Sequence, residues 1–489
     1  MRNRAGSAWT SAIARLRAER APLIALGLLV LAGLAVRIWL TAAWRPAFLG
    51  YPDTGTYLLI AANGPFFADS LRTVGYVVFL RAVHGVSAHL TTVVVTQHLL
   101  GVASALLLYG AVRRLTRSPW PGLLAAAVVL LCGTEVFLEH AILTESMFIF
   151  LLAGAVYATV RALDSDRIWW PLLAGLLVGT ATTVRVVGLF MVPVVASALV
   201  FIRRSSWLTR GRLAGAALAG SLAILFAYAA AQDDQAGYFG LTRAGLWNFY
   251  GRVAPFADCR QFTPPKGTAQ LCETTPPSKR PGPETYVFGG SSPAVRAFGG
   301  PFNDPQASND KVAAFARAAA INQPLDYLHA IVRDMWRYVA PDSFNFPGAG
   351  LSATGFVDQN LLIPVPRTLT PYWQTSGYRI DRGAERSLDR YERDTRLQGP
   401  LMVILVLLAL AAPFLARGRR ERVGAAFLTV AAAGSLVVPV ASFYYDARIA
   451  VPAFGLLAAA AAVGAFGLVR LLGPLVARRL PTARKRELV

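Results

Sequence analysis

The sequence has little cysteine and little histidine: three cysteines and five histidines among 489 residues. Cys259 and Cys272 have no cluster of histidines beside them, which argues against a zinc site built from Cys and His. Cys132 falls within an apolar stretch and is expected to be a small core residue. A single histidine such as His140 rarely marks a metal site. The sequence therefore predicts no metal-binding residues and firmly implies no cofactor, while it leaves the need for a divalent metal open.

Charged residues are also scarce, at 15%, whereas hydrophobic residues make up 55% and the mean hydropathy is +0.46. This composition excludes an ordinary soluble globule and is typical of a polytopic membrane protein. The boundary between the fifth and sixth apolar stretches is open, because both are short and they meet at Arg185. The ten apolar stretches cover residues 21–43, 90–112, 119–138, 145–163, 169–184, 186–202, 213–231, 399–416, 423–442 and 449–469.

An internal repeat and a good signal-peptide cleavage site are missing as well. A transporter built from inverted repeats should show paired, interrupted helices in its two halves, and seven stretches, one polar segment and three more stretches do not divide that way. The first apolar run is about 20 residues long, enough to span a bilayer. Because Ala43-Trp44-Arg45-Pro46 is a poor cleavage site, we expect a plain first helix.

The net charge of +21 would suggest nucleic acid in a soluble protein. Here its distribution indicates topology instead. With the N-terminus inside, the six inner segments hold 24 basic residues, whereas the short outer loops hold five. This is the positive-inside pattern, with some attraction to anionic lipid. We therefore expect a multi-pass protein of the inner or plasma membrane with both termini cytoplasmic, and no binding of nucleic acid.

The same topology divides the chain into three parts. Residues 1–231 form an N-terminal membrane module that contains the first outer loop, residues 44–89. Residues 232–398 form the only large polar segment and are predicted to lie outside. Residues 399–489 form a C-terminal membrane module with a basic cytoplasmic tail.

The large polar segment is rich in Pro and Gly from 258 to 305, which indicates loops with few regular elements. Apolar residues at helical spacing predict helices at 309–320 and 324–338. Cys259 and Cys272 both lie in this outer segment, where an oxidising compartment permits a disulfide between them.

Ionisable groups near the membrane gather on one side of this topology. They are expensive there and usually functional. Asp53 and Arg72 lie in the first outer loop, and the other outer turns hold further members. These are Glu135, Glu139, His140, Glu145, Arg185, Asp446 and Arg448.

A carboxylate facing several arginines suits substitution at an anomeric carbon. Asp53 would be the general base that takes the proton of the acceptor hydroxyl. Arg72, Arg185 and Arg448 would bind the phosphate that leaves with growing negative charge. Aromatic side chains that could stack on a sugar, with Glu145 in the same pocket, are Tyr51, Tyr57, Tyr76, Tyr444 and Tyr445.

Each of these residues also has a structural interpretation. Asp53 lies in a Pro-Asp-Thr-Gly sequence with strong turn chemistry. Arg72 could anchor an interfacial helix formed by residues 71–81, although that segment could also be a simple approach to the second span. Arg185 could pair with a buried acid, and Arg448 with the neighbouring acid or with lipid headgroups. Glu145 could stabilise the start of a helix.

Four segments carry a resemblance to a known superfamily. They are Pro52-Asp53-Thr54-Gly55-Thr56-Tyr57, Arg72-Thr73-Val74-Gly75-Tyr76-Val77-Val78-Phe79-Leu80, Leu143-Thr144-Glu145-Ser146-Met147-Phe148 and Asp446-Ala447-Arg448-Ile449-Ala450-Val451-Pro452. In order and content the chain resembles the GT-C superfamily of polyprenyl-phosphate-dependent glycosyltransferases, and within it the protein-mannosyltransferase and aminoarabinose-transferase-like branch. It departs from the pattern where Thr54 replaces a second acid and where Val74 and Val77 replace prolines.

The resemblance implies an all-α polytopic membrane protein with a GT-C-like fold, about ten transmembrane helices and a mixed or irregular extracytoplasmic domain between helices 7 and 8. It also implies an inverting sugar transfer from a polyprenyl-phosphate donor to an envelope glycan, glycolipid or protein. The main rival is a multi-pass transporter or lipid flippase. A second rival is a non-catalytic assembly protein of the envelope.

Overall fold

The computed structural model describes residues 2–165, 167–202, 206–340, 369, 371–375 and 379–479. Helices dominate this part of the chain, and the one sheet in it pairs β1 (Trp44–Arg45) with β2 (Arg379–Ile380) in antiparallel register. Residues 341–368 of the predicted outer segment and the end of the predicted basic tail, residues 480–489, lie outside the described residues.

Seven helical stretches within the described residues are long and apolar enough to cross a membrane. They belong to α1 (Arg2–Ala43), α4 (Leu90–Thr116), α7 (Glu145–Leu163), α10 (Trp207–Ala236), α16 (Arg382–Thr395) with α17 (Gly399–Leu415), α18 (Gly418–Ser442) and α19 (Ala447–Arg479). The predicted fifth and sixth spans are the shorter apolar helix α8 (Trp169–Val184) and the helical stretch formed by η1 (Val186–Phe190) and α9 (Met191–Ile202). The polytopic, helical fold class is confirmed, whereas the count of ten spans stays a prediction.

The third predicted span, residues 119–138, is not one continuous helix. It consists of α5 (Gly122–Leu131) and α6 (Gly133–His140), which meet at Cys132 with a bend of 51°. A side chain at Gly133 would meet the Cα of Glu392 in α16 at 2.6 Å, and the Gly133 N–H donates to Thr395 Oγ1 at 2.9 Å. The break therefore coincides with the close approach of α16, which only a glycine at position 133 permits. With this bent pair counted as one span, the described part has up to eight.

Small residues let α8 and α10 pack backbone against backbone. A Cβ added at Gly175 would lie 1.9 Å from the carbonyl oxygen of Ala217, and one at Gly220 would lie 2.6 Å from that of Leu172. Ser221 Oγ donates to the Gly175 carbonyl at 3.0 Å. Such close approach is the usual basis of helix association in lipid, where the hydrophobic effect between helices is absent.

We expect Gly175→Ala to destabilise the membrane bundle by about 1–3 kcal/mol, because the added methyl group overpacks this contact. Thermal unfolding in detergent should show a Tm several degrees lower. The matched control is Gly215→Ala on α10, where a Cβ would meet nothing within 4 Å. The control should keep or slightly raise the Tm, since alanine favours a helix. Equal effects of the two substitutions would contradict this account of the α8–α10 contact.

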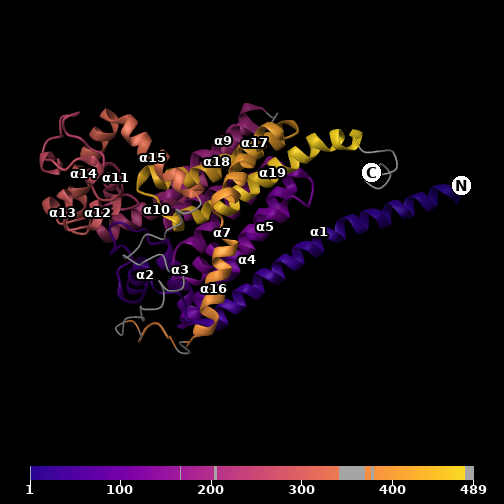
Figure 1. Cartoon of the computed structure of the whole chain (residues 1–489), viewed down its shortest axis with the longest axis horizontal. Helices are drawn as coiled ribbons and strands as arrows, with labels where there is room; N and C mark the ends of the chain where they lie inside the picture. Colours follow the sequence, from indigo (N-terminus) through magenta and orange to yellow (C-terminus); the bar gives the residue numbers. More distant parts are fainter. Residues whose placement is uncertain are drawn as a thin grey trace.

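The large polar segment, residues 232–398, contains a helical domain with its own core, called the outer domain after the side predicted for it. The domain consists of α11 (Leu246–Val253), η2 (Ala269–Leu271), η3 (Pro277–Lys279), α12 (Pro283–Phe288), α13 (Pro293–Phe298), α14 (Pro305–Asn322) and α15 (Pro324–Val339). Trp247, Tyr250, Tyr286 and Phe315 are buried together at its centre. Figure 1 shows α11 to α14 gathered at the end of the molecule away from both termini. The two helices predicted at 309–320 and 324–338 are confirmed, and the predicted loop region contains four short helical elements.

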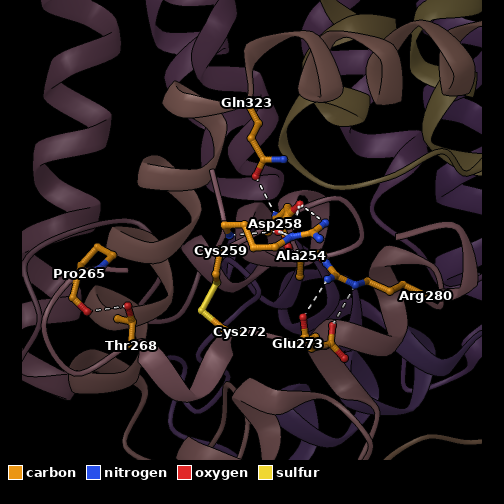
Figure 2. The surroundings of a disulfide bond; sticks show 11 residues. Ala254, Asp258, Cys259, Pro265, Thr268, Cys272, Glu273, Arg280 and Gln323 are labelled. Atoms are coloured by element: carbon orange, nitrogen blue, oxygen red, sulfur yellow. Dashed lines mark hydrogen bonds and ion pairs between the residues drawn. A yellow bond between two sulfur atoms is a disulfide. The ribbon is translucent and has the colours of Figure 1, made fainter. Parts of the chain in front are cut away.

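The irregular part of this domain is held by the predicted disulfide, which is confirmed: Cys259 and Cys272 are bonded, with their Cα atoms 5.9 Å apart. Figure 2 shows Arg280 beside this bridge. Its guanidinium donates to the carbonyls of Ala254 and Ala257 at 3.0 and 2.7 Å. These bonds satisfy two backbone carbonyls beyond the end of α11.

The predicted first outer loop, residues 44–89, contains two short helices, α2 (Pro52–Asn63) and α3 (Gly75–Val86). Proline in the first turn of α2 suits a helix start, because its fixed φ is already helical and it has no N–H to leave unpaired. At Gly75 an added Cβ would lie 2.6 Å from the carbonyl oxygen of Thr183, near the end of α8. Gly75 thus allows the loop that carries Arg72 to approach Arg185.

Candidate active site

Asp53 lies in the first turn of α2, and its carboxylate is held between two arginines. Oδ1 accepts hydrogen bonds from Arg72 Nε at 3.0 Å and Nη2 at 2.5 Å. Oδ2 accepts from Arg448 Nη2 at 2.8 Å. The side chain of Asp53 is 21% exposed, so it is accessible without facing open solvent. Arg72 lies in the loop just before α3, and Arg448 lies at the start of α19, 395 residues after Asp53 in the chain.

Glu145, the first residue of α7, provides a second carboxylate, which is buried. Its Oε1 accepts from Arg185 Nη1 at 2.5 Å and lies 3.3 Å from Arg448 Nε. Arg448 therefore bridges Asp53 and Glu145. All five of the charged residues predicted to carry catalysis, donor binding or the pocket acid are brought into one continuous network.

Two further aspartates fix the backbone around this network. Asp69 accepts from Arg72 Nη1 at 2.8 Å and from the N–H groups of Leu71 and Arg72 at 2.7 and 2.8 Å. Asp446 accepts from the Arg448 N–H at 2.8 Å. Asp69 was not predicted as a site residue, although an aspartate three residues before an arginine in a loop suits this turn geometry.

The electrostatic balance favours an ionised Asp53. Burial raises the pKa of its carboxyl, but the charges and hydrogen bonds of Arg448 and Arg72 outweigh that effect and hold the pKa well below its usual range. Each arginine predicted to bind phosphate already has a carboxylate partner. An incoming anion would therefore compete with Asp53 and Glu145 for these guanidiniums.

The pKa of Asp446 is shifted in the opposite direction from that of Asp53. Burial raises its pKa to about 6, although Arg448 opposes this shift. Because the pKa of an aspartate in the unfolded chain is about 3.9, the folded protein binds this proton more tightly. The free energy of unfolding should then fall by about 2–3 kcal/mol as the pH rises from about 4 to about 6.

We expect Asp446→Asn to remove this dependence. The Tm of the wild type minus that of Asp446→Asn should decrease as the pH rises through this window, and should be flat above about pH 7. Asp53 does not interfere with this measurement. Because its pKa is lowered in the folded protein, its contribution to the free energy of unfolding is lost only as the pH falls below about 4. Parallel pH profiles for the wild type and the variant would contradict the assignment.

Three of the tyrosines predicted to stack on a sugar are more buried than Asp53. Tyr57 and Tyr76 meet edge to face with ring centroids 5.1 Å apart, and the Tyr76 hydroxyl donates to Gln97 Oε1 at 2.6 Å. Tyr76 and Tyr445 are both fully buried. Tyr445 packs on Tyr338, with centroids 4.8 Å apart. A role for these rings in holding a sugar stays a prediction.

A second charged network lies among α1, α4 and α6. The Arg37 guanidinium binds both carboxylate oxygens of Glu139, at 2.7 and 2.6 Å, and His98 Nδ1 is 2.8 Å from Glu139 Oε2. His98 in turn contacts His140. Glu139 and His140 were predicted to lie near the outer face with Asp53, and that position stays a prediction. The turn that follows them adjoins the helix of Asp53, because Thr54 Oγ1 donates to the Ile142 carbonyl at 3.2 Å. Arg37 was missed, although an arginine inside the first apolar run was the available signal.

The outer domain adds one acid that sequence reasoning missed. Glu284, at the start of α12, is close enough to Asp53 and Arg448 for their charges to act on it. Burial and the charge of Asp53 raise its pKa, while Arg448 opposes the shift. Among the described residues, no group of three or more His, Cys, Asp or Glu side chains could hold a metal ion.

Residues 74–228 match the model of the dolichyl-phosphate-mannose-protein mannosyltransferase family. Comparison of the sequence with curated proteins gives no match. The chain is similar in structure to the oligosaccharyltransferase of Archaeoglobus fulgidus tethered to an acceptor peptide, with a TM-score of 0.46 and 13% identity over 95% of this chain and 51% of that one. It is also similar to ArnT from Cupriavidus metallidurans bound to undecaprenyl phosphate, with a TM-score of 0.35 and 13% identity over 93% and 80% of the two chains. The chain spans about half the length of the oligosaccharyltransferase.

The fold and the site define a multi-pass membrane protein with a charged centre at the ends of its helices. The matched segment runs from the start of α3 into α10 and includes Glu145 and Arg185. This match covers about a third of the chain, so the likeness to the mannosyltransferase family is a likeness of this segment.

Proposed function

We propose that this protein is a membrane glycosyltransferase that moves a sugar from a polyprenyl-phosphate donor to an extracytoplasmic acceptor, with inversion at the anomeric carbon. The observation that carries the proposal is the position of Asp53 between Arg72 and Arg448, with Glu145 and Arg185 joined through Arg448. A carboxylate and several guanidiniums at one point are what such a transfer needs.

In the proposed reaction the acceptor hydroxyl attacks the anomeric carbon while the bond from that carbon to the phosphate oxygen breaks. The hydroxyl proton passes to Asp53, and the electron pair of the broken bond leaves on the polyprenyl phosphate. Arg72, Arg448 and Arg185 would stabilise that growing negative charge with charge-assisted hydrogen bonds.

The position of Asp53 between two arginines suggests how a weakly basic aspartate could serve as the general base. Held by two arginines, Asp53 has a low pKa and little affinity for a proton. A donor phosphate that draws Arg72 and Arg448 toward itself would weaken both ion pairs and raise the pKa of Asp53. The base would then become effective only when the donor is bound.

We further propose that the termini lie in the cytoplasm and that residues 232–398 lie outside, in the cell membrane of the organism. The site would then face the outer leaflet, and the charges of Asp53 and Arg448 would act on Glu284 of the outer domain. This places the domain where it could receive an envelope glycan, a glycolipid or a protein acceptor.

The test uses the purified full-length protein in proteoliposomes with a panel of radiolabelled polyprenyl-phosphate sugars and envelope extracts. Transfer of label, with the anomeric configuration inverted in the product, is expected for one donor class. Uptake of solute or movement of lipid between leaflets without any transfer would overturn the proposal and favour the transporter or flippase.

A further inference from the structure

The outer-domain helix α15 presents an apolar stripe that the described part of the protein leaves uncovered. Leu325, Leu328, Val332 and Trp336 are 78%, 54%, 56% and 67% exposed. Their spacing of three, four and four residues aligns them along one side of the helix. Single exposed apolar residues are common, but a stripe along a whole helix marks an interaction surface.

Contacts on its other sides fix the orientation of α15. Ile331 and Met335 pack against the core of the membrane bundle. The Tyr327 hydroxyl donates to the carbonyl of Ala441, at the end of α18, at 2.8 Å. Asp334 is buried and accepts from Arg252 of α11 at 2.5 Å. The stripe therefore cannot turn inward without breaking these contacts.

The stripe adjoins the surface of the membrane spans. α15 packs against α17 and α18, and Figure 1 shows it between α11 to α14 and the bundle. Near its start α17 exposes Leu401 and Ile404, at 48% and 52%, and it exposes apolar residues along the rest of its length. On a helix apolar enough to span, these side chains are positions for lipid contact. The exposed face of α15 extends this apolar surface toward the outer domain.

Two arginines border the stripe, and one of its own members is a tryptophan. The side chains of Arg333 and Arg337 are 62% and 40% exposed, and they lie 3.6 and 3.9 Å from Asp334, which already binds Arg252. A long arginine stem can lie on apolar surface while its head reaches the lipid phosphates. Trp336 is of the residue type most enriched where bilayers meet water. A second protein copy would not require this combination.

We propose that α15 is an interfacial helix that lies in the bilayer leaflet nearest the active site, with its stripe among the upper acyl chains and Arg333 at the lipid phosphates. This function does not depend on sugar transfer. It would fix the height of the outer domain above the membrane through the α15 contacts to α18 and to Arg252.

The test is a depth measurement on the full-length protein in nanodiscs of phosphatidylethanolamine and phosphatidylglycerol. In a Cys132→Ala background, a nitroxide is attached at Leu328→Cys or at Val332→Cys, and its collisions with oxygen and with a water-soluble nickel chelate are compared. Asp310→Cys, on the exposed side of α14, is the water reference. Leu407→Cys, exposed on the span α17, is the lipid reference.

Labels at 328 and 332 should favour oxygen over the nickel chelate and lie about 5–10 Å below the phosphates, shallower than the label at 407. Three results would overturn the proposal. Collisions like those at 310 would place the stripe in water, protection from both reagents would mean that protein covers it, and dipolar broadening between labels would identify a second copy as its partner.

Discussion

Asp53→Asn should reduce the turnover number for sugar transfer by about a hundredfold to ten-thousandfold, the range expected when a general base is lost. Asparagine has nearly the same shape but cannot accept the acceptor proton. The donor should still bind, because Arg72 and Arg448 lose a competing carboxylate and keep their charge. The measurement is single-turnover transfer in proteoliposomes together with the Kd of the donor.

Asp69→Asn provides the matched control. Asp69 also binds Arg72, at 2.8 Å, but it has no contact with Arg448 among its hydrogen bonds and ion pairs. If Asp53 only anchors Arg72, the two substitutions should have similar effects. If it is the base, the rate should fall far more for Asp53→Asn. A turnover number for Asp53→Asn within a factor of a few of the wild type would remove Asp53 from the chemistry.

The convergence of the site could be predicted from the sequence because membrane topology is strongly constrained. Successive loops lie on opposite sides of the membrane, and the basic loops mark the cytoplasmic side. The remaining loops hold Asp53, Glu145, Arg185 and Arg448, so these residues were expected together on the other side. The structure shows Arg448 bridging Asp53 and Glu145, whereas the sequence offered the neighbouring acid or lipid as its partners. Which acid pairs with which arginine depends on side-chain geometry that a topology does not contain.

Other features depended on packing between distant segments. The bend at Cys132 arises where α16 approaches Gly133, and nothing in the apolar run 119–138 signals that neighbour. The pairing of Arg37 with Glu139 likewise joins α1 to α6, 102 residues later in the chain. For Tyr445, proximity to Arg448 in sequence suggested an open ring, but its side chain turns into the core against Tyr338.

Arg448→Gln should have the largest combined effect on stability and function. Arg448 is the only guanidinium in the described network that contacts both Asp53 and Glu145, at 2.8 and 3.3 Å. Without Arg448, Glu145 would pair only with Arg185, and Asp53 only with Arg72, among the arginines of this network. Breaking a buried ion pair by removing one partner lowers the free energy of unfolding by about 3–5 kcal/mol. We expect a clear fall in Tm in detergent, weaker donor binding and transfer near the detection limit.

Two comparisons separate charge from geometry at this position. Arg448→Lys keeps the charge, but a single ammonium cannot make both contacts as a planar guanidinium does, so we expect partial recovery of Tm and little recovery of transfer. Arg45→Gln, which removes an exposed arginine outside the network, should leave both quantities unchanged. Normal donor affinity and normal Tm in Arg448→Gln would show that Asp53 and Glu145 are held independently. The bridging of the two carboxylates, and with it the proposed release of Asp53 by the donor phosphate, would then be wrong.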